Sequence, residues 1–194
     1  MKRFLTVLFL TVLSVAAEAQ GTKAVCGFDG GMMLHAGYLY ARFPQVGDVS
    51  GMTFGIGGVA RIHFGRHWRV GGEGYVSSLV RPGEGGFIRC GWGGLLCDFY
   101  WPLGCFVPYA GLTAGGGANT NLLVTGEKRG DWEVLEGSYY NKRGFFALDP
   151  FIGCDYVISE SFHLTLKVDW LNCISAESGM PSGPRLYAGF IFFH

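Results

Sequence analysis

Histidines are the residues of this chain that most directly suggest chemistry. Five are present, and a histidine beside a hydroxyl and a carboxylate is the arrangement that activates a nucleophile in hydrolases. His163 and Thr165 have such a spacing, but no serine and carboxylate are expected to converge on them. His63 and His67 lack clustered cysteine or carboxylate partners. The sequence therefore predicts no catalytic residue, no metal site and no cofactor.

Cysteines are the second group with potential chemistry. The six cysteines allow fifteen disulfide connectivities in an oxidising compartment. Cys97 and Cys105 flank one predicted tight turn and share face parity, so they could form a disulfide across a hairpin. Cys90 and Cys154 share the parity of apolar neighbours and are interpreted as small, free hydrophobic side chains.

Charged residues form the best-defined constellation, because they recur at alternate positions of extended segments. Buried charges cost several kcal/mol each unless they are paired. The signs are nearly balanced, which favours a salt-bridge network over a conduction path. The predicted network consists of Arg61, Arg69, Glu73, Arg89, Asp149, Asp155, Lys167, Asp169 and Arg185.

The N-terminus predicts export. Met1-Lys2-Arg3 is followed by an apolar run over residues 4–15 and by Ala17-Glu18-Ala19, a small-x-small cleavage pattern. The run is too short to span a bilayer comfortably as an anchor. We therefore predict a cleaved signal peptide over residues 1–19 and one domain over residues 20–194.

Composition restricts the fold of the exported part. Hydrophobic residues make up 49% and charged residues 15%, against about 25% charged in soluble domains. After residue 19, no segment has the eighteen continuous apolar residues of a membrane helix. Only helices and closed barrels survive in lipid, because every backbone amide must be bonded internally. The formal net charge of zero gives no indication of nucleic-acid binding.

Eight segments with period-two alternation predict strands that are long enough to cross a bilayer at a tilt. Their connections alternate between tight turns (65–67, 101–104 and 159–161) and longer loops (43–51, 81–86, 120–143 and 175–184). Short periplasmic turns and long extracellular loops are typical of outer-membrane barrels. The predicted strands are residues 32–42, 52–64, 68–80, 87–100, 105–119, 144–157, 162–174 and 185–194.

Alternation alone does not say which face is outside, and a soluble lipocalin-type barrel would put the apolar face inward. Glycines on the charged face favour a crowded polar lumen, since glycine fills the surface of a soluble strand poorly. We therefore predict a closed, antiparallel, eight-stranded transmembrane β-barrel with its apolar face in lipid. The glycines assigned to the lumen are Gly55, Gly57, Gly71, Gly91, Gly93, Gly111, Gly115 and Gly117.

Three segments, residues 108–115, 151–156 and 186–194, resemble strands of the small eight-stranded outer-membrane barrels of the OmpA-like and OmpX-like family. The family usually ends on an aromatic residue, whereas here His194 follows Phe193. The resemblance implies residence in a Gram-negative outer membrane, contact with lipid and lipopolysaccharide, and insertion by the barrel assembly machinery.

The predicted function is structural or interactive, through extracellular loops. A narrow channel or small-ligand transporter is the alternative. A lipid A-modifying enzyme is less favoured, because His163 is expected at the periplasmic end. In the longest loop, Trp132, Tyr139 and Tyr140 are the predicted contact surface for an envelope protein, a polysaccharide or a host component. That loop could also be a hairpin with its tip at residues 127–131.

Overall fold

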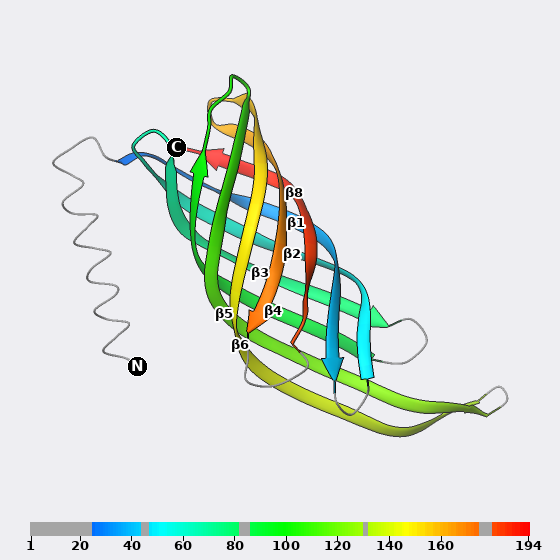
Figure 1. Ribbon diagram of the computed structural model, residues 1–194. Coiled ribbons are helices and arrows are strands. Elements are labelled where there is room, and N and C mark those ends of the chain that lie inside the picture. The colour runs from blue at the N-terminus through cyan, green and yellow to red at the C-terminus, as the bar shows by residue number, and fades with distance from the viewer. Residues whose placement is uncertain (1–24, 44–46, 82–85, 130–131, 175–179) are drawn as a thin grey trace, which may run out of the picture.

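The computed structural model describes residues 25–43, 47–81, 86–129, 132–174 and 180–194, so the predicted signal peptide lies outside the described residues. Within these ranges eight antiparallel strands pair in chain order, and β1 also pairs with β8 (Figure 1). The predicted closed eight-stranded barrel is confirmed. The strands are β1 (Val25–Phe43), β2 (Gly47–Phe64), β3 (Trp68–Arg81), β4 (Gly86–Tyr100), β5 (Phe106–Arg129), β6 (Trp132–Ser159), β7 (Phe162–Ile174) and β8 (Ser182–Phe193).

The predicted long loop over residues 43–51 is wrong, because β1 extends to Phe43 and β2 begins at Gly47. The end of the barrel that contains this connection is called the loop end. Tight turns join β2 to β3, β4 to β5 and β6 to β7 at one end, here called the turn end. Gly65 and Gly104 adopt φ values of 59° and 67° in two of these turns, where a side chain would be strained. The last residue extends the closing ladder, since the backbone amides of His194 and Phe28 each donate to the carbonyl of the other. In the described ranges no helix is long and apolar enough to cross a membrane.

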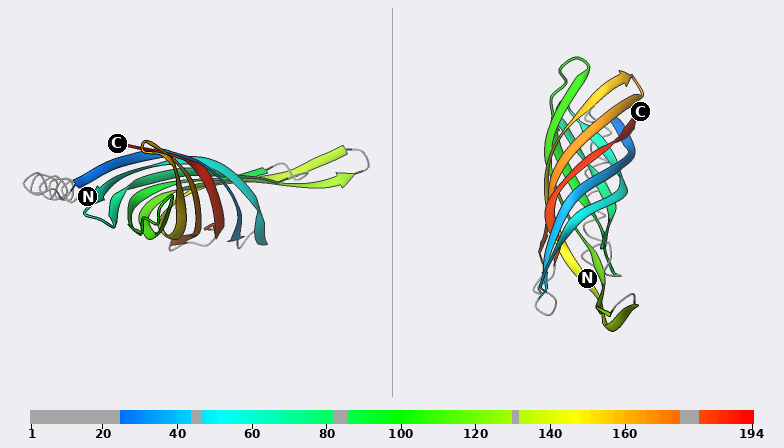
Figure 2. Two further views of the ribbon diagram at one scale, coloured as in Figure 1. Left: turned by 90° about the horizontal axis from the view of Figure 1, so that it is seen from above. Right: turned by 90° about the vertical axis from the view of Figure 1, so that its right-hand side faces the viewer.

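The segment predicted as the longest loop is a β-hairpin, so the hairpin alternative is confirmed. β5 and β6 remain paired from Phe106↔Tyr156 to Arg129↔Trp132, with a register shift between Thr125 and Gly126. This ribbon projects well beyond the end of the barrel opposite the turns (Figures 1 and 2). β-Forming residues on both strands favour the continued pairing, since Leu122 and Leu123 lie opposite Tyr140 and Tyr139.

Polarity is inverted relative to a soluble protein. On β7 the outward Leu166 is 58% exposed, whereas the adjacent inward Lys167 is 2% exposed. The same alternation holds on β2, where Phe54 is 61% exposed and Arg61 is 3% exposed. The soluble inversion is therefore wrong for this chain, and the prediction of an apolar outer face is confirmed.

Inward glycines make room for large polar side chains. A Cβ at Gly57 would lie 1.8 Å from the Tyr75 ring, and one at Gly55 would lie 2.4 Å from the His35 ring. Any larger residue at either position would have to displace a buried ring. These glycines have the lumenal role that the sequence predicted for them.

The predicted face of β4 is wrong. Cys90, Trp92 and Asp98 are buried inside, whereas Arg89 and Cys97 are exposed outside. Gly91 and Gly93 consequently lie on the outward parity. Both faces of this strand carry small and apolar residues, so Arg89 alone guided the assignment. Register with β3 decides the face, because it pairs Asp98 with the inward Arg69.

Candidate functional site

A buried ion cluster fills the lumen near the turn end. Arg61 Nε lies 2.7 Å from Asp29 Oδ1, and Arg69 Nε lies 2.6 Å from Asp98 Oδ1. Arg69 Nη1 also lies 2.9 Å from Asp155 Oδ2. These five residues come from five different strands and are each at most 3% exposed. We call them the turn-end cluster, and their contacts tie strands together that are not neighbours in the sheet.

Aromatic rings and a histidine complete this cluster. His63 Nε2 donates to Asp29 Oδ2 at 2.6 Å. The Arg69 guanidinium carbon lies 4.7 Å from the Tyr109 ring centre and 4.9 Å from the Tyr100 ring centre. Stacking and bidentate pairing are the contacts that a planar guanidinium makes best. The cations are therefore held by both carboxylates and rings.

The middle of the lumen contains the ion pair of Lys167 with Glu73, and Lys167 Nζ also lies 3.9 Å from Asp169 Oδ2. Lys167 Nζ donates to both carboxylate oxygens of Glu73, at 2.9 and 2.7 Å. Tyr75 and Thr113 donate their hydroxyl protons to the same carboxylate at 3.0 and 2.5 Å. The ammonium also lies 4.4 Å from the centre of the Phe151 ring. Glu73 thus receives hydrogen bonds from two strands, β3 and β5, besides holding its cation on β7.

Closer to the loop end, Arg185 is shared by two carboxylates. Its Nε and Nη2 donate to the two oxygens of Asp169 at 2.9 and 2.8 Å, and Nη2 also donates to Asp149 at 3.1 Å. Such a fork is the strong, geometrically specific form of an ion pair. We call these three residues the loop-end cluster. Beside it, His35 Nε2 and Ser77 Oγ are hydrogen-bonded at 2.7 Å.

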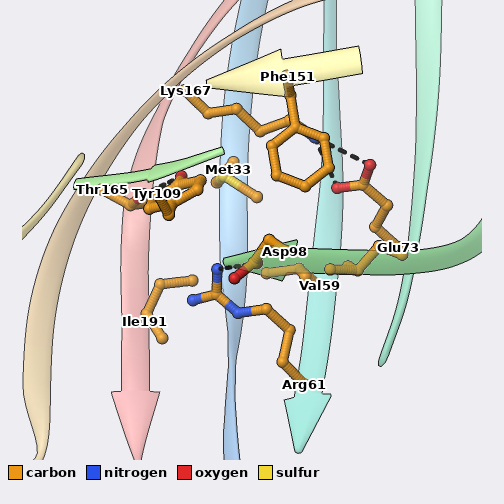
Figure 3. A pocket seen from close by; sticks show the side chains of 11 residues that line it. Met33, Val59, Arg61, Glu73, Asp98, Tyr109, Phe151, Thr165, Lys167 and Ile191 are labelled. Carbon is orange, nitrogen blue, oxygen red and sulfur yellow. Dashed lines mark hydrogen bonds and ion pairs between the residues drawn. The ribbon is translucent and has the colours of Figure 1, made fainter. Parts of the chain in front are cut away.

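The turn-end cluster and the central pair meet at one level of the lumen, where Arg61 and Asp98 of the first and Glu73 and Lys167 of the second line the same space. Figure 3 shows the side chains around a small cavity at this level, which Met33, Val59, Phe151 and Ile191 help to line. The space available to the centre of a water molecule is ≈ 10 Å³. That corresponds to about one water. The lumen at this level is therefore occupied by side chains, as the dimensions of an eight-stranded barrel require.

Eight of the nine predicted network residues come together in the lumen: Arg61, Arg69, Glu73, Asp149, Asp155, Lys167, Asp169 and Arg185. The assignment of Arg89 to this network is wrong, because its side chain is exposed on the outer face of β4. Sequence reasoning missed Asp29 and Asp98. Asp29 precedes the predicted start of the first strand. Asp98 lies on the opposite face of its strand from Arg89, so the inward prediction for Arg89 placed Asp98 outside. The cost of a carboxylate in lipid is the signal that would have placed Asp98 inside.

The cysteine predictions are partly wrong. The predicted disulfide between Cys97 and Cys105 is not compatible with the positions of the two residues in the hairpin. Cys97 lies opposite Leu112, whereas Cys105 precedes β5 in the turn, too far along the strand direction for a bond. Cys154 lies on the outward parity as predicted, between the exposed Ile152 and Tyr156. Cys90, predicted on the lipid face, is 1% exposed inside the barrel.

The predicted contact surface belongs to the protruding hairpin. The register pairs Arg129 with Trp132, Leu123 with Tyr139, and Leu122 with Tyr140. The Tyr140 side chain is 64% exposed. The side chains of Trp132 and Tyr139 lie outside the described part of the molecule. His163, at the turn end, has its ring stacked on Phe193 with 6.0 Å between ring centres.

No protein-family model matches the chain, and no curated protein matches it. Solved structures do share its fold. Ail, the attachment invasion locus protein of Yersinia pestis in complex with the heparin analogue sucrose octasulfate, is 11% identical with a TM-score of 0.55, over 87% of this chain and 99% of that chain. Neisserial surface protein A (NspA) is 13% identical with a TM-score of 0.54, over 86% of this chain and 96% of that chain.

At these identities the similarity concerns the fold. The closed antiparallel ladder and the inverted polarity agree with it. The chain therefore has the fold of the small eight-stranded outer-membrane β-barrels, and the resemblance in its strand motifs is confirmed at this level.

Proposed function

We propose that the protein is an integral outer-membrane barrel of a Gram-negative bacterium, with a closed lumen as its structural core and a protruding hairpin as its contact element. The inversion of polarity is the observation that carries this proposal. An apolar surface around a charged interior is stable in hydrocarbon and costly in water. The role proposed is non-catalytic.

The outer surface changes along the barrel as a membrane location requires. Near the turn end, Trp68, Phe99 and Trp101 form a chain of ring contacts, with ring centres 4.9 and 4.6 Å apart. Such aromatic girdles mark the interface between lipid and water. Phe106 and Tyr156 make a similar contact at 5.2 Å on the adjacent strands.

Two exposed cations lie on the outer face toward the loop end. Arg89 pairs with Thr120 in the sheet, and Thr120 pairs with Lys142. Arg89 and Lys142 are both exposed and belong to strands about 10 Å apart. We propose that they contact phosphates of lipopolysaccharide, which would orient the hairpin outward. The closing β8–β1 ladder would be the segment that the barrel assembly machinery completes.

The lumen contacts support a plugged barrel over the narrow-channel alternative. A conducting path would have to pass the two ion clusters and the central pair, all of which are dehydrated and cross-strand. Breaking such pairs leaves uncompensated buried charge, at a cost of about 3–5 kcal/mol. Pure protein in planar bilayers should therefore show no stable conductance. Steady, ion-selective single-channel steps would establish the channel instead.

Outer-membrane residence has a direct test. Protein expressed from the full chain should fractionate with the outer membrane and migrate differently on gels before and after boiling. Recovery in the soluble periplasmic fraction would contradict the proposal. The conductance measurement is independent of this result, so the membrane location and the plug are tested separately.

The hairpin is proposed as the site that binds an envelope or extracellular protein, or a glycan. Its ribbon carries the exposed Tyr140 and, by sequence, Trp132 and Tyr139 beside several charges. Aromatic residues next to charges are the types that anchor contacts. Because Ail was crystallised with a heparin analogue, a sulfated saccharide is a suitable first glycan probe.

A register-preserving truncation tests the hairpin. Gly126 pairs with Leu135, so residues 127–134 can be replaced by Asn-Gly, which favours a tight hairpin turn. Combined with Tyr139→Ser and Tyr140→Ser, which remove the two contact tyrosines that the truncation leaves in place, the variant should keep heat-modifiable migration and lose the partners recovered by cross-linking on cells. A variant that retains the same cross-linked partners would show that the hairpin tip is not the contact site.

A further inference from the structure

Two lumenal cysteines meet across the barrel. Cys90 on β4 is 1% exposed, and Cys173 on β7 packs against the same buried cluster of side chains. Cys173 pairs in the sheet with Ala147, which is 0% exposed, so both cysteines point inward. β4 and β7 are separated by β5 and β6 around the wall. The two side chains nevertheless meet across the narrow lumen, as free thiols joined by a hydrogen bond.

Their position is next to the loop-end cluster. Cys173 lies on the inward face of β7 four residues from Asp169, and its sheet partner Ala147 lies two residues from Asp149 on β6, so the thiol pair is beside this network. We propose that Cys90 and Cys173 form a disulfide across the lumen of the exported protein, tying β4 to β7 beside the loop-end cluster.

The reaction is an ordinary thiol–disulfide exchange. One cysteine, as its thiolate, attacks the disulfide of an oxidant such as a periplasmic protein disulfide or glutathione disulfide, and a mixed disulfide forms. The second cysteine then displaces the oxidant's remaining thiol. The two cysteines lose two electrons and two protons in total, and the oxidant's disulfide is reduced to two thiols. Because Cys90 is buried in the folded barrel, oxidation must precede or accompany barrel closure.

A cross-link between β4 and β7 would add a constraint that sheet pairing does not provide. Sheet pairing joins each strand only to its two neighbours. A bond between residues about 80 apart in sequence removes much more freedom from the unfolded chain than a hairpin bridge would. The bond would also hold β4 and β7 at a fixed separation across the lumen beside Arg185.

Cys97 and Cys154 are matched controls within the same chain. Cys97 is paired with Val70 and Leu112 on the outer face. Cys154 is paired with Pro108 and Leu166, also on the outer face. Neither has a cysteine opposite it in these registers, so serine at either position should leave the proposed bond intact.

Counting thiols in denatured protein tests the bond without requiring a folded variant. Protein from the outer membrane is denatured in the presence of a maleimide-polyethylene glycol reagent, with or without prior reduction. Wild type should gain two labels on reduction. Cys90→Ser and Cys173→Ser should each lose that gain, whereas Cys97→Ser and Cys154→Ser should keep it. No gain in wild type, or a gain that survives in Cys90→Ser, would overturn the assignment.

A second measurement separates the bond from export. Purified, reduced protein is refolded into lipid vesicles in a buffer of reduced and oxidised glutathione, and then quenched with acid. The bond should form during refolding, and the oxidised protein should melt about 5–10 °C higher than the same protein refolded under reducing conditions. The Cys90→Ser variant should show no such difference. Equal melting temperatures for oxidised and reduced wild type would contradict a stabilising cross-link, even if the protein resided in the outer membrane as proposed.

Discussion

The lumen and the protruding hairpin follow opposite structural rules. Each lumenal ion cluster is held by side chains from three or more strands, and its members are almost fully buried. The hairpin extends beyond the strands next to it. Pairing of β5 with β4 ends at Leu122, and pairing of β6 with β7 begins at Phe146. Beyond these residues, in the described part of the chain, β5 pairs with β6 alone. Stability and contact are therefore assigned to separate parts of one sheet.

Removing a lumenal cation should have the largest effect. Arg69→Leu would leave Asp98 and Asp155 without their closest charge partner, at 2.6 and 2.9 Å in the native protein. We expect the free energy of unfolding to fall by about 3–5 kcal/mol. Urea unfolding in lipid vesicles measures it. A loss below about 1 kcal/mol would show that the turn-end cluster is dispensable.

The central pair should show coupling between its two members. Lys167→Met and Glu73→Gln should each cost about 2–4 kcal/mol, because each removes the closest charge partner of the other residue, at 2.7 Å in the lumen. The double variant should cost clearly less than the sum of the two singles. Simple additivity in this double-mutant cycle would mean that the two charges do not depend on each other.

Shortening the hairpin should affect stability much less than either change in the lumen. Replacing residues 127–134 by Asn-Gly removes only β5–β6 pairs that, among the described residues, lie beyond the pairing with β4 and β7. We expect a change in unfolding free energy of about 1 kcal/mol or less, measured by the same urea titration. A loss comparable to that of Arg69→Leu would show that the hairpin belongs to the barrel's cooperative unit.

The smallest effect on the free energy of unfolding is expected from a substitution of Arg89, the arginine that lies on the outer face of β4. Arg89→Ala removes an exposed charge on the outer face, so the change in unfolding free energy should be within about 0.5 kcal/mol. Binding to vesicles that contain lipopolysaccharide should nevertheless weaken if Arg89 contacts phosphate. Unchanged binding by an Arg89→Ala, Lys142→Ala double variant would contradict that part of the proposal.

Much of the barrel follows from the sequence alone. Side chains alternate across a strand with a period of two, so the pattern of Leu164, Leu166 and Val168 against Thr165, Lys167 and Asp169 defines two faces without any structure. Tight turns such as Gly65-Arg66-His67 depend on residues that are adjacent in sequence, and so do the longer connections. The number of strands, the closure of the barrel and its apolar outer face can therefore be predicted from the sequence.

Only the tertiary structure decided what depends on register between strands. The face of β4 was ambiguous, because small and apolar residues occur on both of its parities, and pairing of Asp98 with Arg69 resolved it. The same pairing brought Asp98 into the turn-end cluster and turned Arg89 outward. The meeting of Cys90 with Cys173 depends on which side chains cross the lumen. Periodicity along one strand contains no information about such contacts, because they are set by the stagger of strands around a closed barrel.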